Sequence, residues 1–470
     1  MKHQLQNRMF SELSNRKIFD RAHQFAFDYL DSIFDREVYP TKKALEDLEL
    51  FDEPIPKEPS QPEAILEQLH RLGSPATTAT LGGRYFGFVC GSAVPIGLAA
   101  KTMATFWDQA SAMYVMSPLA GKLESVVENW LLDLLGLPQK TVAGFVSGTS
   151  VANLCGLAAA RYRILKNKGW DINQQGLWGA PKIRIVTSRH AHSTVLKALS
   201  ILGLGQQDIE WIPVDDQGRM IPEALPVLDN NTILILQAGN VNSGAFDDFQ
   251  TICETANRAG SWVHIDGAFG LWAAAVHQLK HLTKGMHLAN SWAVDGHKTL
   301  NTPYDSGIVL CSDSEALTSA LHMSASYLIE SDQRDGMFHT PEMSRRSRVI
   351  ELWAILKYLG TAGVDELVLN MHLRAKQFAN EIKKVNGFHV VNDIVFNQVL
   401  VQCENDKLTD KVLGNIQELR DCWVGGSFWF GKKVIRVSIC SWATSESDIA
   451  TTVASFEKAY QISIKHLNAQ

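Results

Sequence analysis

Two polar segments, each directly after an apolar run, carry groups that could hold a flat, phosphorylated ligand. Gly148, Thr149 and Ser150 follow the run GFVS and open a helical pattern, so backbone N–H groups, two hydroxyls and a helix dipole would be available to a phosphate. His192 follows the run IRIVTS and could stack on a planar ring. Each signal also has an ordinary alternative, because small residues and serine begin many helices and a strand-end histidine is commonly a hydrogen-bonding residue.

An acid and an amine occupy the same kind of position further along the chain. Asp266 ends the run WVHID, where burying a charge is costly unless a cation lies beside it. A protonated pyridine nitrogen would be such a cation, since the carboxylate would hold its proton and keep the ring electron-withdrawing. His297 and Lys298 come just after the run SWAVD, where the lysine amine could react with an aldehyde. The alternatives are that Asp266 caps a helix and that Lys298 is a solvated surface lysine.

The order of these signals favours a single site. Each lies just past a predicted strand, and the 32 residues between Asp266 and Lys298 (298 − 266) leave room for one helix and one strand. Because the carboxyl ends of parallel strands meet at one edge of a sheet, where ligands gather, we expect the turn, the imidazole, the carboxylate and the amine to surround one cofactor.

The elements that would position these residues alternate between strand and helix. Between about residues 143 and 311, continuous apolar runs are separated by helical patterns, which predicts an α/β fold with a mostly parallel sheet covered on both faces. Helical spacing over 19–38 and a proline-rich segment after it predict an N-terminal arm and linker. A helix over 349–359 and two later strands predict a smaller α/β lobe. The expected organisation is an N-terminal helical arm at 1–80, a large cofactor-binding domain at 81–348 and a small C-terminal domain at 349–470.

The composition excludes several other classes of protein. The chain has 470 residues, of which 46% are hydrophobic, and a net charge of −6, so it can bury a large core and has no basic block suited to nucleic acid. Its first residues are polar and no apolar run is long enough to span a bilayer. The seven cysteines are scattered without a Cys-x-x-Cys pair, which disfavours disulfide scaffolding and a zinc site. We expect a cytoplasmic protein without a metal ion.

The stretch from about Tyr85 to Trp442 resembles the group II pyridoxal 5′-phosphate (PLP)-dependent decarboxylases, of fold type I in the aspartate aminotransferase superfamily. This group includes the aromatic amino acid, glutamate, histidine and diaminobutyrate decarboxylases. The resemblance rests on YFGFVCGSAVP, SPLAGKLESVVENWLLDLLGLP, FVSGTSVANLCGLAAAR, AHSTVLKAL, GNVNSGAFDD, WVHIDGAFG and DGHKTLN. The His-Lys pair combined with an upstream His-x-Asp and Ala-His-Ser is highly specific for it.

The resemblance implies a role for each candidate residue. Lys298 would carry PLP as a Schiff base, Asp266 would pair with the pyridine nitrogen, and His192 would stack on the ring. It also implies a homodimer with active sites at the subunit interface, an N-terminal arm that crosses it, and the decarboxylation of an L-amino acid to its amine and CO₂. Further residues match the phosphate loop (Gly148, Thr149, Ser150), a position near the phosphate (His297), a small residue against the ring (Ala268) and the substrate pocket (Tyr85, Phe86).

Two departures from the family pattern leave the reaction open. The family's loop tyrosine, which protonates the carbanion, has no counterpart after Tyr327 in YLIESDQRDGMFHTPEMSRR, where Phe338 or His339 stands in that region. His339 could donate the proton, or the enzyme could be an aldehyde synthase that releases CO₂ and ammonia oxidatively; an aminotransferase is a further alternative. The usual threonine-rich turn reads Gly239-Asn240-Val241-Asn242 here, so its polar contacts have changed type.

Arginines near the C-terminal half allow two interpretations each. Arg436 could clamp a carboxylate, which would favour transamination, or could pair with a surface acid, and we therefore leave it out of the predicted site. Arg345, Arg346 and Arg348 could bind an acidic substrate or could be solvated at a helix start. A dinucleotide site is disfavoured, because GLGQQD lacks a preceding strand and a third glycine.

Overall fold

The large lobe is built on a seven-stranded sheet with the strand order β1-β7-β6-β5-β4-β2-β3. The structure, a computed structural model, describes residues 4–322 and 332–468. β7 is antiparallel to both of its neighbours, whereas the other paired strands are parallel, so the expected mostly parallel sheet is confirmed. The strands are β1 (Val142–Val146), β2 (Arg184–Ser188), β3 (Glu210–Ile212), β4 (Thr232–Gln237), β5 (Trp262–Asp266), β6 (Ser291–Asp295) and β7 (Gly307–Cys311).

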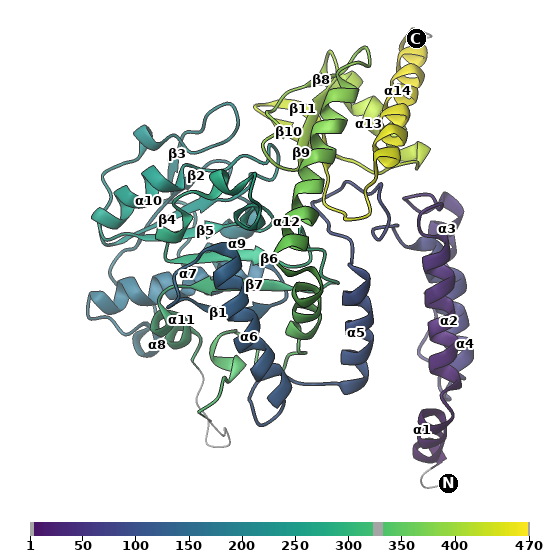
Figure 1. The fold of residues 1–470 in the computed structure, drawn as a ribbon, viewed down its shortest axis with the longest axis horizontal. Helices are drawn as coiled ribbons and strands as arrows, with labels where there is room; N and C mark the ends of the chain where they lie inside the picture. The colour runs from purple at the N-terminus through teal and green to yellow at the C-terminus, as the bar shows by residue number, and fades with distance from the viewer. Residues whose placement is uncertain (1–3, 323–331, 469–470) are drawn as a thin grey trace.

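Helices cover both faces of this sheet (Figure 1). All six residues of β4 are buried, and because successive side chains of a strand point to opposite faces, they enter two separate cores. Ile233 and Ile235 pack with residues of α7 and α9, while Leu234 and Leu236 pack with residues of α6 and α10. This is why the strands read as continuous apolar runs. The covering helices are α6 (Pro118–Leu135), α7 (Thr149–Asn167), α8 (Ile172–Gln175), α9 (Ser193–Ile201), α10 (Phe249–Arg258) and α11 (Ser314–Leu321).

The segment between Asp266 and Lys298 differs from the expected helix and strand. It contains three 3₁₀ turns, η5 (Gly270–Ala275), η6 (Lys280–Thr283) and η7 (Met286–Leu288), before β6. Nearly every residue of η5 is buried, so no solvent-facing side is left for an amphipathic α-helix. Packing into the core therefore decides the conformation of this segment.

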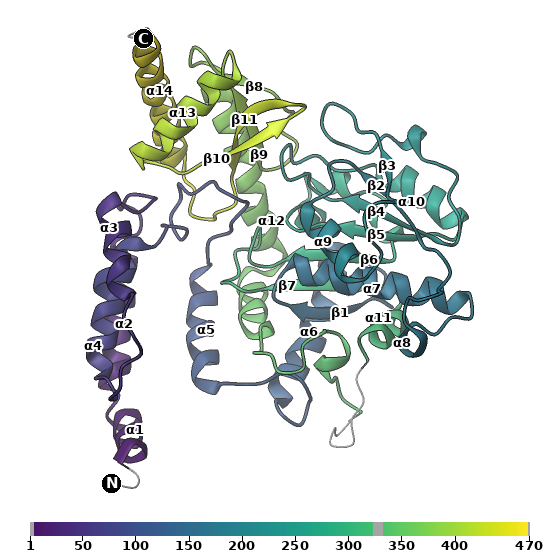
Figure 2. The same ribbon diagram turned by 180° about the vertical axis from the view of Figure 1, so that it is seen from behind.

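The N-terminal helices lie on the side of α5 (Pro95–Trp107) that faces away from the large sheet (Figures 1 and 2). The helix expected over 19–38 ends earlier, at Ser32, because the later residues make tertiary hydrogen bonds: the Val38 N–H donates to the Arg420 carbonyl in the small lobe (2.9 Å), and its carbonyl accepts from Ala79. The arm consists of α1 (Gln4–Asn15), α2 (Lys17–Ser32), α3 (Lys42–Glu46), η1 (Asp47–Phe51), α4 (Pro62–Gln68), the π-helical turn η2 (Leu69–Gly73) and η3 (Ser74–Ala76).

The small lobe combines a four-stranded antiparallel sheet, in the order β10-β11-β9-β8, with three helices. Its first helix, expected to end at residue 359, continues to Ile382 past a break at Gly360 (φ 58°, ψ −172°). The helix resumes because Val364 and Val368 after the break are also buried. The elements are η8 (Gly336–Phe338), which precedes the lobe, α12 (Val349–Ile382), β8 (His389–Val390), β9 (Gln398–Gln402), α13 (Asp406–Leu419), β10 (Gly425–Trp429), β11 (Lys432–Ser438) and α14 (Glu446–Asn468).

All seven cysteines are free thiols. Among the described residues, no helix has both the length and the apolar character needed to cross a membrane.

Candidate active site

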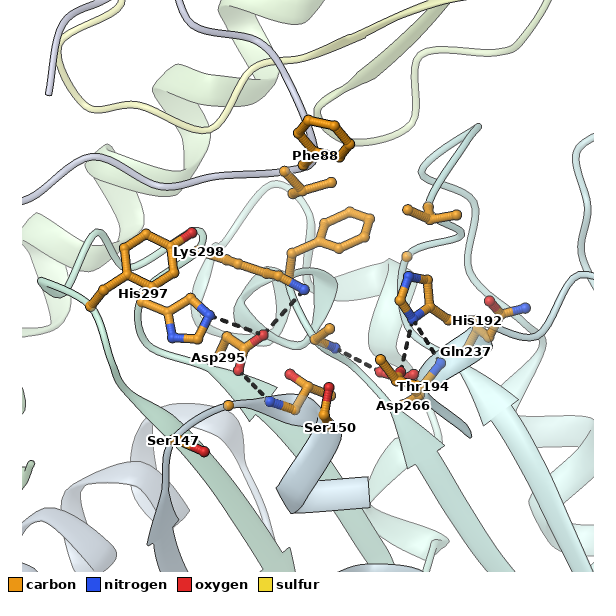
Figure 3. Close-up of a pocket in the computed structure, with 18 residues that line it drawn as sticks. Phe88, Ser147, Ser150, His192, Thr194, Gln237, Asp266, Asp295, His297 and Lys298 are labelled. Atoms are coloured by element: carbon orange, nitrogen blue, oxygen red, sulfur yellow. Dashed lines mark hydrogen bonds and ion pairs between the residues drawn. The ribbon is translucent and has the colours of Figure 1, made fainter. Parts of the chain in front are cut away.

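A cavity of about 510 Å³ opens at the carboxyl ends of the central strands. All eight residues predicted for the site line it (Figure 3). Tyr85 and Phe86 do not, but the next residues of that segment, Phe88 and Val89, do. The complete lining is Phe88, Val89, Ser147, Gly148, Thr149, Ser150, His192, Thr194, Gln237, Gly239, Val241, Asp266, Ala268, Phe269, Asp295, His297, Lys298 and Tyr304.

The turn before α7 has the properties of an anion site. It precedes a 19-residue helix, whose N-terminus carries partial positive charge. The Thr149 hydroxyl is buried and has no hydrogen-bond partner among the described residues, so an acceptor or donor is still needed there. The turn is also tightly enclosed: a Cβ on Gly148 would lie 3.2 Å from the His297 ring, and one on Gly307 would lie 2.3 Å from the Gly148 backbone. These residues fit a phosphate better than a larger group.

Asp266 presents a buried carboxylate with no ion-pair partner in the described part of the chain. It accepts hydrogen bonds from Asn153 Nδ2 (3.1 Å) and from the Ala268 N–H (3.2 Å). Asn153 is held in turn by His264, which also contacts Ser291. Burial lowers the pKa of His264 to about 3, so this ring is neutral and the chain of hydrogen bonds behind Asp266 is fixed. The carboxylate is therefore oriented and still lacks a cation, as a protonated ring nitrogen would require.

The sequence left two roles open for His192, a hydrogen-bonding residue and a ring that contacts a cofactor, and its position is compatible with both. Its Nδ1 caps α9 by accepting a hydrogen bond from the Thr194 N–H (3.3 Å), and the same atom lies 2.8 Å from the Thr194 hydroxyl. The ring also lines the cavity. Burial lowers the pKa of His192, and the nearby Asp266 carboxylate opposes that shift. A mainly neutral, flat ring is thus available on the cavity wall.

Lys298 reaches the cavity from the loop after β6. Its Nζ lies 3.1 Å from Asp295 Oδ2, and His297 Nε2 lies 3.6 Å from the same oxygen. The Ser306 N–H donates to His297 Nδ1 (3.1 Å), and burial lowers the pKa of His297. Amine, imidazole and carboxylate therefore form one cluster beside the Thr149 turn (Figure 3).

Several residues that line the cavity were not among those predicted from the sequence. Asp295 carried the same signal as Asp266, because both end an apolar strand, and could have been found by it. Tyr304 stacks on the His297 ring with centroids 4.4 Å apart, and Gln237 ends β4. Phe88 and Val89 have left-handed backbone conformations, and their placement depends on packing that no local pattern reveals.

His339 does not line the cavity that contains Lys298. It lies in a different hollow, together with Phe338 and Arg334, and burial, assisted by the Arg334 charge, lowers its pKa to about 3. Within one chain, His339 is therefore not part of the wall of the Lys298 cavity, and its role as a proton donor stays a prediction. Tyr327 and part of the loop around it lie outside the described residues.

Three of the four arginines already pair with acidic side chains. Arg345 pairs with Glu124 in the interior (2.8 Å), and Arg346, whose side chain is 37% exposed, and Arg348 pair with Asp305, so each of the three already has a carboxylate partner within the chain. Arg436, by contrast, has no carboxylate within ion-pair distance among the described residues, and its Nη1 donates to the Val241 carbonyl (3.1 Å). The turn expected to contact ligand contributes Gly239 and Val241 to the cavity, while the side-chain oxygen Oδ1 of Asn240 accepts from the backbone N–H groups of Asn242 and Ser243 in the turn itself.

Fold and site together define an α/β enzyme with a cavity suited to a phosphorylated aromatic aldehyde. The family model described as "Pyridoxal-dependent decarboxylase conserved domain" matches residues 45–403. The chain therefore belongs to the pyridoxal-dependent decarboxylases, which are PLP-dependent carboxy-lyases.

Curated relatives support this family but differ in substrate. An acidic amino acid decarboxylase from Mus musculus is 30% identical over 64% of this chain and 56% of its own length. An aromatic-L-amino-acid decarboxylase from Bacillus atrophaeus is 28% identical over 72% of this chain and 71% of its own length. The chain thus spans little more than half of the mouse relative.

A solved structure reproduces the fold over nearly the whole chain. The structure of Oryza sativa TDC with PLP and tryptamine has a TM-score of 0.87 and 21% identity, and the match covers 96% of this chain and 98% of that one. This likeness establishes fold type I for both lobes.

Proposed function

We propose that this chain removes the α-carboxylate of an L-amino acid as CO₂, using PLP bound at Lys298. The observation that supports this most directly is the convergence of a lysine amine, an unpaired buried carboxylate and a helix N-terminal turn on one cavity. These three groups match the aldehyde, the ring nitrogen and the phosphate of the cofactor.

Each residue would contribute a separate physical effect. When bound, PLP supplies an electron-withdrawing ring for the electrons of the breaking bond. Asp266 would hold a proton on the ring nitrogen, since its carboxylate is buried and otherwise unpaired. The Gly148–Ser150 turn would orient the phosphate, and His192 and Ala268 would cover the two faces of the ring and exclude water. Lys298 would hold the aldehyde carbon and give way to the substrate amine.

Arg436 supports a substrate with an acidic side chain. Its guanidinium is largely buried and has no carboxylate partner in the described ranges 4–322 and 332–468, and burial lowers its pKa. A buried cation of this kind is stabilised by an anion. It lies close enough to His192 to influence that ring electrostatically and donates to Val241, a residue of the cavity wall. A carboxylate or sulfinate at the end of the substrate would supply the missing anion.

A panel of amino acids tests this proposal. We expect the purified protein with PLP to release CO₂ and amine from aspartate, glutamate or cysteine sulfinate at least tenfold faster than from aromatic amino acids. Arg436→Gln should raise the KM for the acidic substrate about tenfold or more, because a charged pair with a buried guanidinium is lost, and should alter the KM for an aromatic substrate less. Measuring ammonia and hydrogen peroxide in the same assays separates decarboxylation from aldehyde synthesis, and a preference for aromatic substrates would refute the assignment of Arg436.

We also propose that the arm pairs two copies of the chain, with active sites at the interface. No residue of α1 is buried, and α2 buries only Phe25. Yet α1 exposes Leu5, Met9 and Leu13 at i, i+4 and i+8, which places them in one stripe. A short helix of this kind gains stability only by packing on another surface.

Free thiols throughout the chain support a cytoplasmic location.

Charging this stripe should weaken the pairing. We expect Leu13→Asp to raise the dissociation constant of a homodimer at least tenfold, because it places a charge in an apolar contact, whereas Asn7→Asp, at an exposed position on the opposite side of the same helix, should leave it nearly unchanged. Sedimentation equilibrium would measure both against the 52.1 kDa mass of one chain. A wild-type protein that sediments as a single chain would contradict the proposal.

A further inference from the structure

Asp295 stands out because its carboxylate already occupies part of the phosphate turn. The residue ends β6 and its side chain is 2% exposed. Its Oδ1 accepts a hydrogen bond of 2.7 Å from the Thr149 N–H, the first backbone donor of α7. Its Oδ2 lies 3.1 Å from Lys298 Nζ. One buried anion therefore bridges the lysine that would hold the aldehyde and the turn that would hold the phosphate.

The cationic groups around Asp295 balance its single negative charge but leave little positive charge to stabilise a second anion. Lys298 is the only basic side chain described within ion-pair distance besides His297. His297 accepts from the Ser306 N–H at Nδ1, so the neutral ring carries its proton on Nε2 and turns an N–H, rather than a full charge, toward the carboxylate. A phosphate dianion at Gly148–Ser150 would thus meet a like charge that is screened only partly.

Competition for one donor adds to this repulsion. The Thr149 N–H can point at only one acceptor with good geometry, and a phosphate at the helix N-terminus would need it. Because Asp295 is buried, solvent contributes little screening.

From this arrangement we infer that Asp295 is a positioning residue that weakens the hold of the turn on the cofactor's phosphate and keeps PLP exchangeable. The inference rests on the assignment of the cavity to PLP, but it does not depend on which reaction follows. It predicts that a neutral side chain of the same shape binds the phosphate more tightly, since asparagine can still accept from the Thr149 N–H without carrying a charge.

Three ligands applied to the cofactor-free protein test the inference without any turnover. For Asp295→Asn we expect the dissociation constants of PLP and of inorganic phosphate, the latter measured by competition with PLP, to fall at least tenfold. Pyridoxal, which has the aldehyde and ring but no phosphate, should bind with a dissociation constant within about threefold of the wild-type value. Asp266→Asn serves as a control with the opposite expected result. It should raise the dissociation constants of PLP and pyridoxal alike and leave that of inorganic phosphate unchanged.

The outcomes separate this inference from the proposed function. Unchanged or weaker binding of both PLP and phosphate by Asp295→Asn would overturn it, as would a gain shared equally by pyridoxal. Thermal unfolding would establish that the variant is folded; if it is not, Asp295→Ser removes the same charge with a smaller side chain and should give the same gain. A protein that binds these ligands as expected but decarboxylates no amino acid would refute only the proposed function.

Discussion

Replacing Lys298 with alanine is expected to abolish the yellow colour of the PLP-loaded protein and to lower kcat/KM by roughly four orders of magnitude or more, in the range seen when a covalent catalytic residue is removed. The physical reason is that Lys298 supplies the one amine described in the cavity wall, so without it the cofactor is held only by non-covalent contacts. Absorbance spectra, borohydride labelling followed by peptide mass analysis, and CO₂ release measure the three parts of this expectation.

An exposed lysine provides the matched control for that experiment. Lys182 forms a surface ion pair with Asp208 (2.9 Å), and neither residue lines the cavity. Such pairs contribute little to stability. Lys182→Ala should therefore retain colour and activity. Labelling that persists in Lys298→Ala would mean that another amine carries the cofactor and would refute the site.

Changing Asp266 to asparagine is expected to lower kcat about a thousandfold, which corresponds to ~4 kcal/mol of transition-state stabilisation. The carboxylate is buried, is held by Asn153 and Ala268, and has no ion-pair partner in the described chain. An amide in its place cannot hold a proton on the ring nitrogen, so the ring withdraws electrons less strongly. Steady-state kinetics at saturating PLP would show the loss in kcat with a smaller change in KM.

A second aspartate tests whether the loss is specific. Asp248 caps α10 by accepting from the Thr251 N–H (3.1 Å), and asparagine is an equally good cap, so Asp248→Asn should retain activity and stability. If Asp266→Asn binds PLP and keeps more than a tenth of the wild-type kcat, the role assigned to this carboxylate is wrong.

The candidate site could be predicted largely because its residues follow strands. A largely apolar run predicts a buried strand, and a polar residue at or just after its end, such as Asp266 or Lys298, predicts a side chain at the carboxyl edge of the sheet. The same logic applied to Asp295 would have found it. Local patterns could not place Phe88 or Tyr304, because these residues reach the cavity from loops whose course depends on packing and hydrogen bonds with distant parts of the chain.

The limits of prediction for the fold have a similar physical origin. The glycine at position 360 is a good marker for the end of a helix, yet α12 resumes after it, because the next apolar residues belong to the core. The segment after Asp266 forms short 3₁₀ turns in place of the expected helix, because η5 is almost completely buried and its packing in the core sets its conformation. In both segments, tertiary packing overrides a local preference.

The course of α12 has a consequence for how the molecule holds together. Residues from Val349 through Val368 pack in the core beneath the large sheet, and those from Met371 through Ile382 pack in the core of the small lobe. The break at Gly360 falls before Val364 and therefore within the first of these contacts, not between the lobes. The unbroken part of α12 after Gly360 therefore packs in both cores, through Val364 and Val368 in the first and from Met371 onward in the second. Unfolding of either core would remove contacts that hold this helix in the other. We therefore expect the two lobes to unfold as one cooperative unit, and the same helix fixes the position of β11, which carries Arg436, relative to the large sheet that positions Lys298.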